Sequence, residues 1–439
     1  MTKFRRRGLW ALLSLLGLFV LGGIAARLGA SWYLQSDRFR QQITFAVGKE
    51  LRADGDFMSL HFADGTFYTD GYVARGQSGA FFSDLRAEQI RAAVNWRGLL
   101  DHRWEVDELN VQNLDVRFAD RSSPTPAPVE VVPHLPKKKS AWKLDLRRAA
   151  VAESSWRWGA TPDTAGSVTH AAFTLLPNDG AWLLDASSGT LAQTGWPSLT
   201  ITSAKLRYTG ASLFVTESEL HNGAGRITVN GEVRFAHAAD LQAQFENVEI
   251  TPLLPADWRL RLHGNLSGSA HLTAPLPGND VRVESDLRLI NGQLEAVPLL
   301  DEIASFTRTE RFRRLDLTRG SLSFTRQAGV ITIKNLLLES EGLMRVEGNC
   351  TIAQQKIDGV FQVGVTSASL QWLPGSQARV FTVAHDGYYW TPLRLTGSVD
   401  HPHEDLTRRL VAAAANELLQ KSGDDLIDTA KSLLDLMPH

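Results

Sequence analysis

Hydrophobic and polar residues alternate along most of this chain, and this two-residue period constrains the fold more than any other feature. Successive side chains of a β-strand point to opposite faces of its sheet, so alternation predicts strands with one apolar and one polar face. The clearest case is the segment 226–235. Its apolar positions are Ile227, Val229, Val233 and Phe235, and its polar positions are Arg226, Thr228, Glu232 and Arg234.

The same pattern returns in later segments, so the expected apolar face extends over many strands. Its later members are Met344, Val346, Cys350, Ile352, Ile357, Phe361, Val363, Val365, Leu393, Leu395 and Val399. From about Phe57 to Val399, strand-like runs are separated by turn signals, which are Asp64-Gly65, Asp70-Gly71, Asn230-Gly231 and Asn291-Gly292. The sequence therefore predicts a mainly β chain arranged as an antiparallel meander.

A closed barrel or a two-layer sandwich is the alternative arrangement, because either would hide the apolar face under protein. Against it, about 340 residues at roughly 12–15 per strand and turn give on the order of 25 strands without an evident covering layer. Spaced about 4.8 Å apart, they would extend one continuous sheet to the order of 100 Å. A weak repeat also favours an extended body, since residues 231–255 resemble residues 348–374: a glycine-led strand, a polar turn, a second strand, then Leu-Pro.

The first residues predict a membrane anchor. Lys3 and Arg5, Arg6 and Arg7 precede an uncharged, mostly apolar stretch that is long enough to cross a bilayer core of about 30 Å. We expect residues 1–7 to be a cytoplasmic basic tail and residues 8–28 a transmembrane helix. Its anchoring side chains are Trp10, Leu12, Leu13, Leu16, Phe19, Val20 and Ile24. A cleaved signal peptide is the alternative, although its apolar region would normally be shorter, about 7–15 residues.

Three further segments depart from the strand pattern. Apolar residues at every fourth position predict a short amphipathic helix at residues 36–51, and residues 122–140 are too rich in proline and lysine for a strand, so we expect a disordered loop. Helical spacing at residues 297–306 predicts a short helix over an opening in the sheet, formed by Leu299, Leu300, Ile303 and Phe306. The expected divisions are therefore residues 36–121 (helix and first strands), 122–140 (loop), 141–402 (main β body) and 403–439 (amphipathic helices, with a break at 422–423).

Composition excludes several functions. Basic and acidic residues nearly balance, 46 against 48, so the chain lacks the field that binds nucleic acid. One cysteine, Cys350, cannot form an internal disulfide, and we expect it to serve packing. No HExxH, paired CxxC, P-loop or dinucleotide motif is present, so we expect no enzyme activity, cofactor or metal.

Three weaker signals each have two interpretations. The run Gly76-Gln77-Ser78-Gly79-Ala80 lacks the final glycine of a nucleophile elbow and is better explained as a hairpin turn. His401 and His403 flank Pro402 and either begin a helix or contact a metal. The basic run Arg311, Arg313 and Arg314 is either a solvated surface or a contact for lipid phosphates.

Four passages, in this order, resemble the AsmA-like family, which is related to TamB and to the chorein-type bridge-like lipid transfer proteins. They are SDRFRQQITFAVGKEL (36–51), AAVNWRGLLDHRWEVDELNVQNLDVRF (92–118), the segment 290–365 that begins INGQLEAVPLLDEIASF, and LTGSVDHP (395–402) followed by EDLTRRLVAAAANELL. The most family-like region is about 285–402. The resemblance implies a long antiparallel sheet curled into an open half-tube, with short helices at both ends and an apolar groove for acyl chains.

The resulting expectation is a single-pass protein of a bacterial inner membrane, with its C-terminal body in the periplasm, that binds phospholipid or another acyl lipid and assists lipid transport or envelope homeostasis. The groove should be lined by the inward apolar residues named above. The C-terminal helices either contact envelope proteins or a membrane, or cap the sheet edge. An envelope scaffold that pairs its sheet edge with outer-membrane proteins is the rival, and a hydrolase is disfavoured by the missing motifs.

Overall fold

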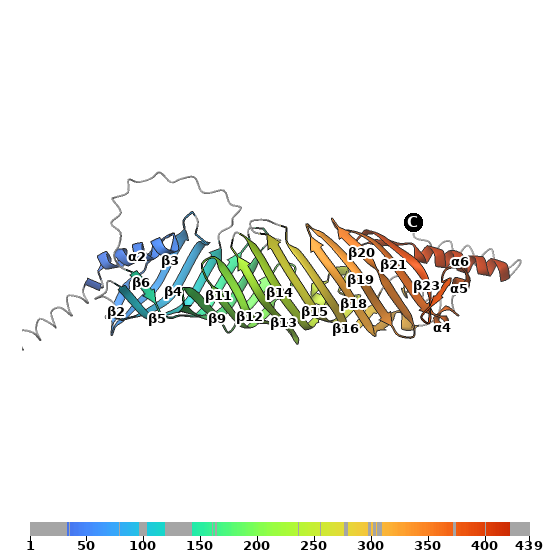
Figure 1. Cartoon of the computed structure of the whole chain (residues 1–439), viewed down its shortest axis with the longest axis horizontal. Coiled ribbons are helices and arrows are strands. Elements are labelled where there is room, and N and C mark those ends of the chain that lie inside the picture. The colour runs from blue at the N-terminus through green and yellow to red at the C-terminus, as the bar shows by residue number, and fades with distance from the viewer. Residues whose placement is uncertain are drawn as a thin grey trace, which may run out of the picture. The chain divides into compact units, whose positions relative to one another are not determined.

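The chain is mainly β (Figure 1). The computed structural model describes residues 33–421 except 35, 79, 96–102, 119–142, 160, 163–164, 236, 255, 276–279, 297–299, 302–303, 305–309, 372–374 and 400. Contacts divide the chain into two compact units, an N-terminal unit, Met1–Thr194, and a C-terminal unit, Gly195–His439. The predicted mainly β class is confirmed in both units.

Among its described residues, the N-terminal unit has the helix α2 followed by ten strands. The predicted helix at residues 36–51 is confirmed, because the Ser36 side chain accepts a hydrogen bond from the Phe39 amide and Arg52 ends the helix in the left-handed conformation. The elements are α2 (Asp37–Leu51), β1 (Ala53–Phe57), β2 (Leu60–Ala63), β3 (Thr66–Gly76), β4 (Phe82–Asn95), β5 (Arg103–Phe118), β6 (Lys143–Leu146), β7 (Ala149–Trp158), β8 (Gly166–Asn178), β9 (Ala181–Ala186) and β10 (Thr190–Gln193).

One connection in this unit corrects the prediction of a wholly antiparallel meander. Strand β5 pairs with β6 and β7 in parallel, with Leu109 opposite Ala149 and Val111 opposite Val151. Antiparallel neighbours can be joined by a two-residue hairpin, whereas parallel neighbours need a connection of a dozen or more residues. Residues 119–142 are long enough to be such a connection between β5 and β6. The predicted loop at residues 122–140 lies outside the described residues, and the strands on either side of it belong to one unit.

The C-terminal unit is an antiparallel ladder. Its strands are β11 (Leu199–Tyr208), β12 (Ser212–Asn222), β13 (Gly225–Arg234), β14 (Ala238–Glu249), β15 (Leu262–Pro275), β16 (Arg282–Glu295), β17 (Arg314–Leu317), β18 (Arg319–Gln327), β19 (Val330–Ser340), β20 (Met344–Ala353), β21 (Lys356–Thr366), β22 (Val383–His385), β23 (Tyr388–Ser398) and β24 (Pro402–Glu404). Its helices are η2 (Thr251–Leu253), η3 (Ala256–Trp258), η4 (Glu310–Phe312), α4 (Ser367–Leu370), α5 (Ser376–Arg379) and α6 (Leu406–Lys421). Both copies of the sequence repeat form two paired strands followed by a short helix, η2 after β14 and α4 after β21.

Only one of the four predicted glycine turns is a turn. Asp64-Gly65 joins β2 to β3, whereas the other three pairs lie inside β3, β13 and β16. At Asn230-Gly231 both neighbouring strands keep pairing through the glycine. Gly231 has φ +140°, and a Cβ there would lie 2.2 Å from the Asp240 carbonyl oxygen. Glycine therefore permits a local irregularity inside the strand, not a reversal.

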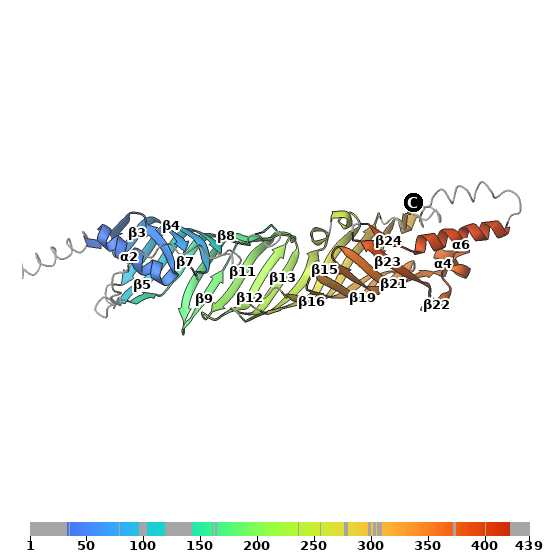
Figure 2. The same cartoon turned by 90° about the horizontal axis from the view of Figure 1, so that it is seen from above.

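Each unit has helices beside its strands (Figure 2), and side chains of these helices pack on the strands. In the N-terminal unit, Phe39 of α2 packs in a core cluster with Phe67, Val94 and Val106 of the strands. In the C-terminal unit, Leu370, Leu406 and Ala413 of α4 and α6 pack with strand residues. Each unit therefore has a helical cover on its own strands.

Several predicted segments fall on residues outside the described range. They are the membrane anchor with Trp10, Leu12, Leu13, Leu16, Phe19, Val20 and Ile24, most of the helix at 297–306, and residues 422–439. Within residues 33–421, as far as they are described, no helix combines the length and the hydropathy needed to span a bilayer.

Candidate lipid-binding face

Cross-strand pairing places the apolar residues of β11 to β23 on a single face of the C-terminal unit. Directly paired residues share a face, and Ile227 of β13 pairs with Leu220 on one side and Phe245 on the other. Following such pairs from strand to strand defines the set that we call the apolar face. Its members in the strands β11 to β19 include Ile201, Leu206, Tyr208, Leu213, Val215, Leu220, Ile227, Val229, Val233, Leu241, Ala243, Phe245, Leu266, Ala270, Leu272, Val283, Leu287, Leu289, Leu322, Phe324, Ile331, Ile333, Leu336 and Leu338.

The middle of the apolar face is only half covered. Among its residues, Val229, Leu241, Leu272 and Phe324 are all of intermediate exposure. The core clusters found among the described residues lie elsewhere, since the buried members of the two in this unit fall within residues 300–343 and 363–413. Among the described residues, the apolar side chains of β12 to β15, and of β16 up to Leu289, thus form a surface outside these clusters.

Polar residues on this face do not make it polar. The buried hydroxyl of Ser218 donates a hydrogen bond to the Val229 carbonyl oxygen at 3.2 Å, and that of Ser285 donates to the Ser269 carbonyl oxygen at 2.8 Å. Because each hydroxyl proton is used within the sheet, these serines act as small residues there. Within the N-terminal unit, Ser154 likewise donates to the Ala171 carbonyl oxygen at 2.8 Å.

The opposite face of the same strands is charged. Arg226 lies 2.8 Å from Glu219 and 3.6 Å from Glu246, and His221 lies 2.8 Å from Glu219. Hydrogen bonds from His221 and Arg226 lower the pKa of Glu219, so this carboxylate stays ionised. Similar pairs, His271 with Asp240 and Arg394 with Asp358, continue this polar face.

At the C-terminal end, the structure differs from the prediction that the inward residues line an open groove. Val363 and Val365 are 4 % exposed and belong to a core cluster with residues of α4 and α6, and the strand residues Met344, Val346 and Leu393 pack against it. Leu300, of the predicted groove helix, is buried in the neighbouring cluster with Phe312 and Leu315. These side chains contact protein because helices follow the strands and cover them.

The other predicted lining residues differ in their surroundings. Phe361 lies flat on its own sheet, because a Cβ at Gly348 or at Gly359 would meet its ring at 2.5 Å. Ile227 is buried. Phe235 is exposed and packs against Tyr208, with ring centroids 6.0 Å apart. The half-buried members are Val229, Val233, Ile352, Ile357, Leu395 and Val399, while Leu299, Ile303 and Phe306 lie outside the described residues.

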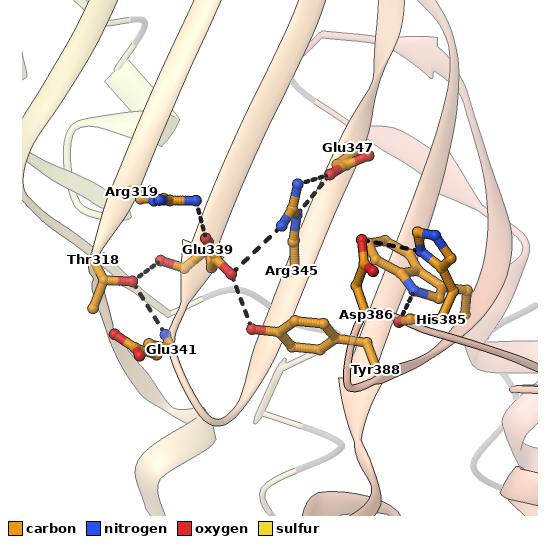
Figure 3. Close-up of polar contacts among 10 residues, drawn as sticks. Thr318, Arg319, Glu339, Glu341, Arg345, Glu347, His385, Asp386 and Tyr388 are labelled. Atoms are coloured by element: carbon orange, nitrogen blue, oxygen red, sulfur yellow. Dashed lines mark hydrogen bonds and ion pairs between the residues drawn. The ribbon is translucent and has the colours of Figure 1, made fainter.

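A closed polar cluster secures the polar face at the same end (Figure 3). The Tyr388 hydroxyl donates a hydrogen bond to the buried carboxylate of Glu339 at 3.0 Å, and Arg319 and Arg345 approach that carboxylate at 3.6 and 3.8 Å. Burial raises the pKa of Tyr388, and the neighbouring Glu339 raises it further. The cluster ties β23 to β18, β19 and β20, and it is fully paired.

The weaker chemical signals have structural explanations. Ala80 donates its amide to the Gln77 carbonyl oxygen in the turn between β3 and β4, so the turn interpretation of residues 76–80 is confirmed. The His401 amide donates a hydrogen bond to the Ser398 hydroxyl. His403 lies in β24 and pairs with Thr396 of β23. No group of three or more histidine, cysteine, aspartate or glutamate side chains suited to a metal occurs among the residues described.

Most members of the middle of the apolar face were missed by strict alternation. The pattern changes phase at register shifts, between Val215 and Ser218 in β12 and between Ile333 and Leu336 in β19. The sequence signal that could have found these residues is apolar alternation on both sides of a register shift, with the apolar residues at odd positions before the shift and at even positions after it, or the reverse. By fold the chain is a mainly β protein, and its C-terminal unit has one apolar and one charged face. Comparison with known proteins finds no matching family model, no matching curated protein and no matching solved structure.

Proposed function

We propose that this chain is an inner-membrane-anchored periplasmic protein of the AsmA-like kind, and that the middle of its apolar face binds lipid acyl chains. The observation that carries the proposal is the half-covered apolar surface of β12 to β16, which lies outside the core clusters of the described residues. Soluble proteins rarely leave a contiguous apolar surface of this kind unless it binds something.

Acyl chains suit the surface because its contacts are non-directional. Each buried CH₂ contributes about 0.8 kcal/mol, so a 16-carbon chain gains on the order of 10 kcal/mol before ordering costs are subtracted. The hydroxyls of Ser218 and Ser285 already donate within the sheet, and Arg326, which pairs with Val283 and Ile331, is a charged side chain on the same face that can meet a lipid phosphate. The protein would then assist the transport of phospholipid or a similar lipid with low selectivity.

The rival function, an envelope scaffold that adds partner strands to the sheet edge, has less support. The last strands of the C-terminal unit, β22 and β24, have three residues each, and β1 and β2 of the N-terminal unit have five and four. Short edge strands limit the addition of a partner strand.

Site-specific photocrosslinking of the full chain in bacterial membranes tests the proposal. A photoreactive residue at Val229 or Leu241, on the apolar face, should capture lipid that mass spectrometry identifies. The same probe at the adjacent Thr228 or Gln242, on the polar face, should not. Equal capture at neighbouring positions, or capture of protein alone, would reject the lipid-binding function.

A further inference from the structure

The segment between β14 and β15 has an unusually exposed apolar side chain. Leu260 is 75 % exposed, more than any other large hydrophobic residue among those described. It follows the short helix η3 and stands between Arg259 and Arg261, with Trp258 directly before them. An exposed leucine in a polar loop is common, but one framed by tryptophan and two arginines has the composition of a membrane-interface segment.

Strand pairing brings a second basic segment, 310–314, to the strand ends beside the first segment, 256–261. We call these two segments the rim. The Glu295 amide donates a hydrogen bond to the Arg261 carbonyl oxygen at 2.8 Å, and Glu295 pairs with Arg314 across β16 and β17. Arg261, Glu295 and Arg314 therefore lie at three successive strand ends. Arg311 and Arg313, in and directly after η4, precede Arg314.

The arginines of the first segment are held by neutral partners. Arg259 donates from Nε to the Leu254 carbonyl oxygen at 2.9 Å, and the Arg261 guanidinium lies 5.8 Å from the centroid of the Trp258 ring. Arg313 is paired with Glu310 at 3.4 Å. The two segments, 256–261 and 310–314, together contain five arginines, against three acidic residues when Glu295 between them is counted. The rim is thus cationic around an exposed leucine.

We propose that this rim docks on the surface of an anionic phospholipid bilayer, with Leu260 among the acyl chains and the arginines on lipid phosphates. Guanidinium groups bind phosphate oxygens in a bidentate manner, and a basic surface segment is drawn to anionic lipid. Tryptophan prefers the interface between headgroups and chains, which is the depth that Trp258 would reach beside an inserted leucine.

The inference rests on the proposed function in one respect, since docking would bring the apolar face to its lipid source. Leu262 and Leu294 pair immediately beside the rim, and Leu266 of the same strand as Leu262 pairs with Leu289, both members of the apolar face. A lipid leaving the bilayer at Leu260 would meet apolar side chains at once.

Depth-dependent fluorescence quenching tests the docking. The full chain is reconstituted in vesicles with a fluorophore on Leu260→Cys, or on Val360→Cys as the matched control. Val360 is also an exposed aliphatic residue, at 52 %, and its neighbours Gly359 and Phe361 lie on the apolar face, so Val360 lies on the polar face. The native Cys350 does not compete for the label, because it is buried and burial raises its thiol pKa.

In vesicles of phosphatidylcholine and phosphatidylglycerol with a spin-labelled lipid, the probe at 260 should be quenched and the probe at 360 should not. The equilibrium constant for docking of the rim on the vesicle surface, measured by quenching at position 260, should fall about fivefold for each arginine replaced in Arg259→Gln and Arg261→Gln. It should also fall in vesicles of phosphatidylcholine alone. Equal quenching at the two positions would overturn the docking proposal. Quenching that is the same in Arg259→Gln and Arg261→Gln as in the unchanged chain would also overturn it.

Two further readouts separate this inference from lipid binding by the apolar face. If lipid capture at Val229 persists while the probe at 260 stays unquenched, docking is rejected and lipid binding stands. If the probe at 260 is quenched while capture at Val229 is absent, the rim binds membrane and the proposed function fails. Crosslinking of position 260 to an acidic protein without quenching would assign the rim to that protein and overturn the proposal.

Discussion

Val229 and Val363 are the same residue type on the same face of one ladder of strands, yet their surroundings differ. Val363 of β21 is 4 % exposed and lies in a core cluster, whereas Val229 of β13 is half-buried and outside the core clusters of the described residues. The strands do not create this difference, because both carry the same alternation. The difference comes from α4, α6 and the residues Val380 and Phe381 after α5, which pack on the end near β21 and β23.

The comparison shows that alternation decides which side of a strand is apolar, and that covering elements decide whether this side becomes core or binding surface. The N-terminal unit follows the same rule. There Phe39 of α2 stacks on Phe67, with ring centroids 5.5 Å apart, and converts part of its apolar side into core. An uncovered middle is then the region available to a ligand.

The largest expected effect comes from truncating a leucine at the covered end. Leu406→Ala removes a side chain that is 1 % exposed in the cluster with Val363, so it should lower the free energy of unfolding by about 2–5 kcal/mol. The matched change in the middle, Leu241→Ala, should cost less than about 1.5 kcal/mol, because Leu241 is only half-buried. Urea denaturation of the full chain measures both.

Equal losses for the two leucines would contradict the distinction between a covered end and an open middle. A large loss for Leu241→Ala in particular would mean that another part of the chain packs on the middle strands.

The second effect concerns the polar side of the covered end. Tyr388→Phe deletes the hydroxyl that donates to the buried carboxylate of Glu339, and hydrogen bonds to charged groups contribute about 1.5–3 kcal/mol. Arg319 and Arg345 remain near the carboxylate, so the loss should fall near the lower end of this range. Thermal or urea unfolding of Tyr388→Phe against the unchanged chain gives the value.

The same tyrosine predicts a pH dependence. Its pKa is raised above the ordinary 10.0, so the folded state binds the phenolic proton more tightly than the unfolded state does. This stability is fully present below pH 10 and is lost as pH rises through the folded pKa. The decline in the free energy of unfolding above pH 10 should therefore be shallower in Tyr388→Phe. An unchanged slope would remove Tyr388 from the stabilising cluster.

The third effect tests the open middle directly. Leu241→Asp places a charge where acyl chains are proposed to bind, and burying an unpaired carboxylate is costly, so lipid capture by a probe at Val229 should fall at least about tenfold. The control Gln242→Asp puts the same charge on the next residue, which faces the other way, and should leave capture unchanged. Similar losses in both variants would show that capture does not depend on the apolar face.

The sequence predicted the strand class, the first helix and the two-faced character of the sheet, because these depend on local periodicity. It could not predict which part of the face is covered, since a core cluster such as the one that holds Leu406 and Val363 joins distant segments. It also missed the phase changes at bulges such as Val215 to Ser218, and it treated Asn230-Gly231 as a turn although both neighbouring strands hold it in the ladder. Long-range pairing overrides these short signals.

The smallest effect should be the same in both regions. Arg394 pairs with Asp358 on the polar side of the covered end, and His271 pairs with Asp240 on the polar side of the middle. All four side chains are well exposed, and exposed pairs contribute less than about 1 kcal/mol, so Arg394→Gln and His271→Gln should each change the free energy of unfolding by less than that. If helical cover on the apolar side is the only difference between the two regions, the two changes should match within error. A clearly larger loss for Arg394→Gln would mean that the polar side, too, is organised differently at the covered end. That result is expected if the pair of Arg394 and Asp358 is coupled to the Glu339 cluster, so that the cluster extends to β21.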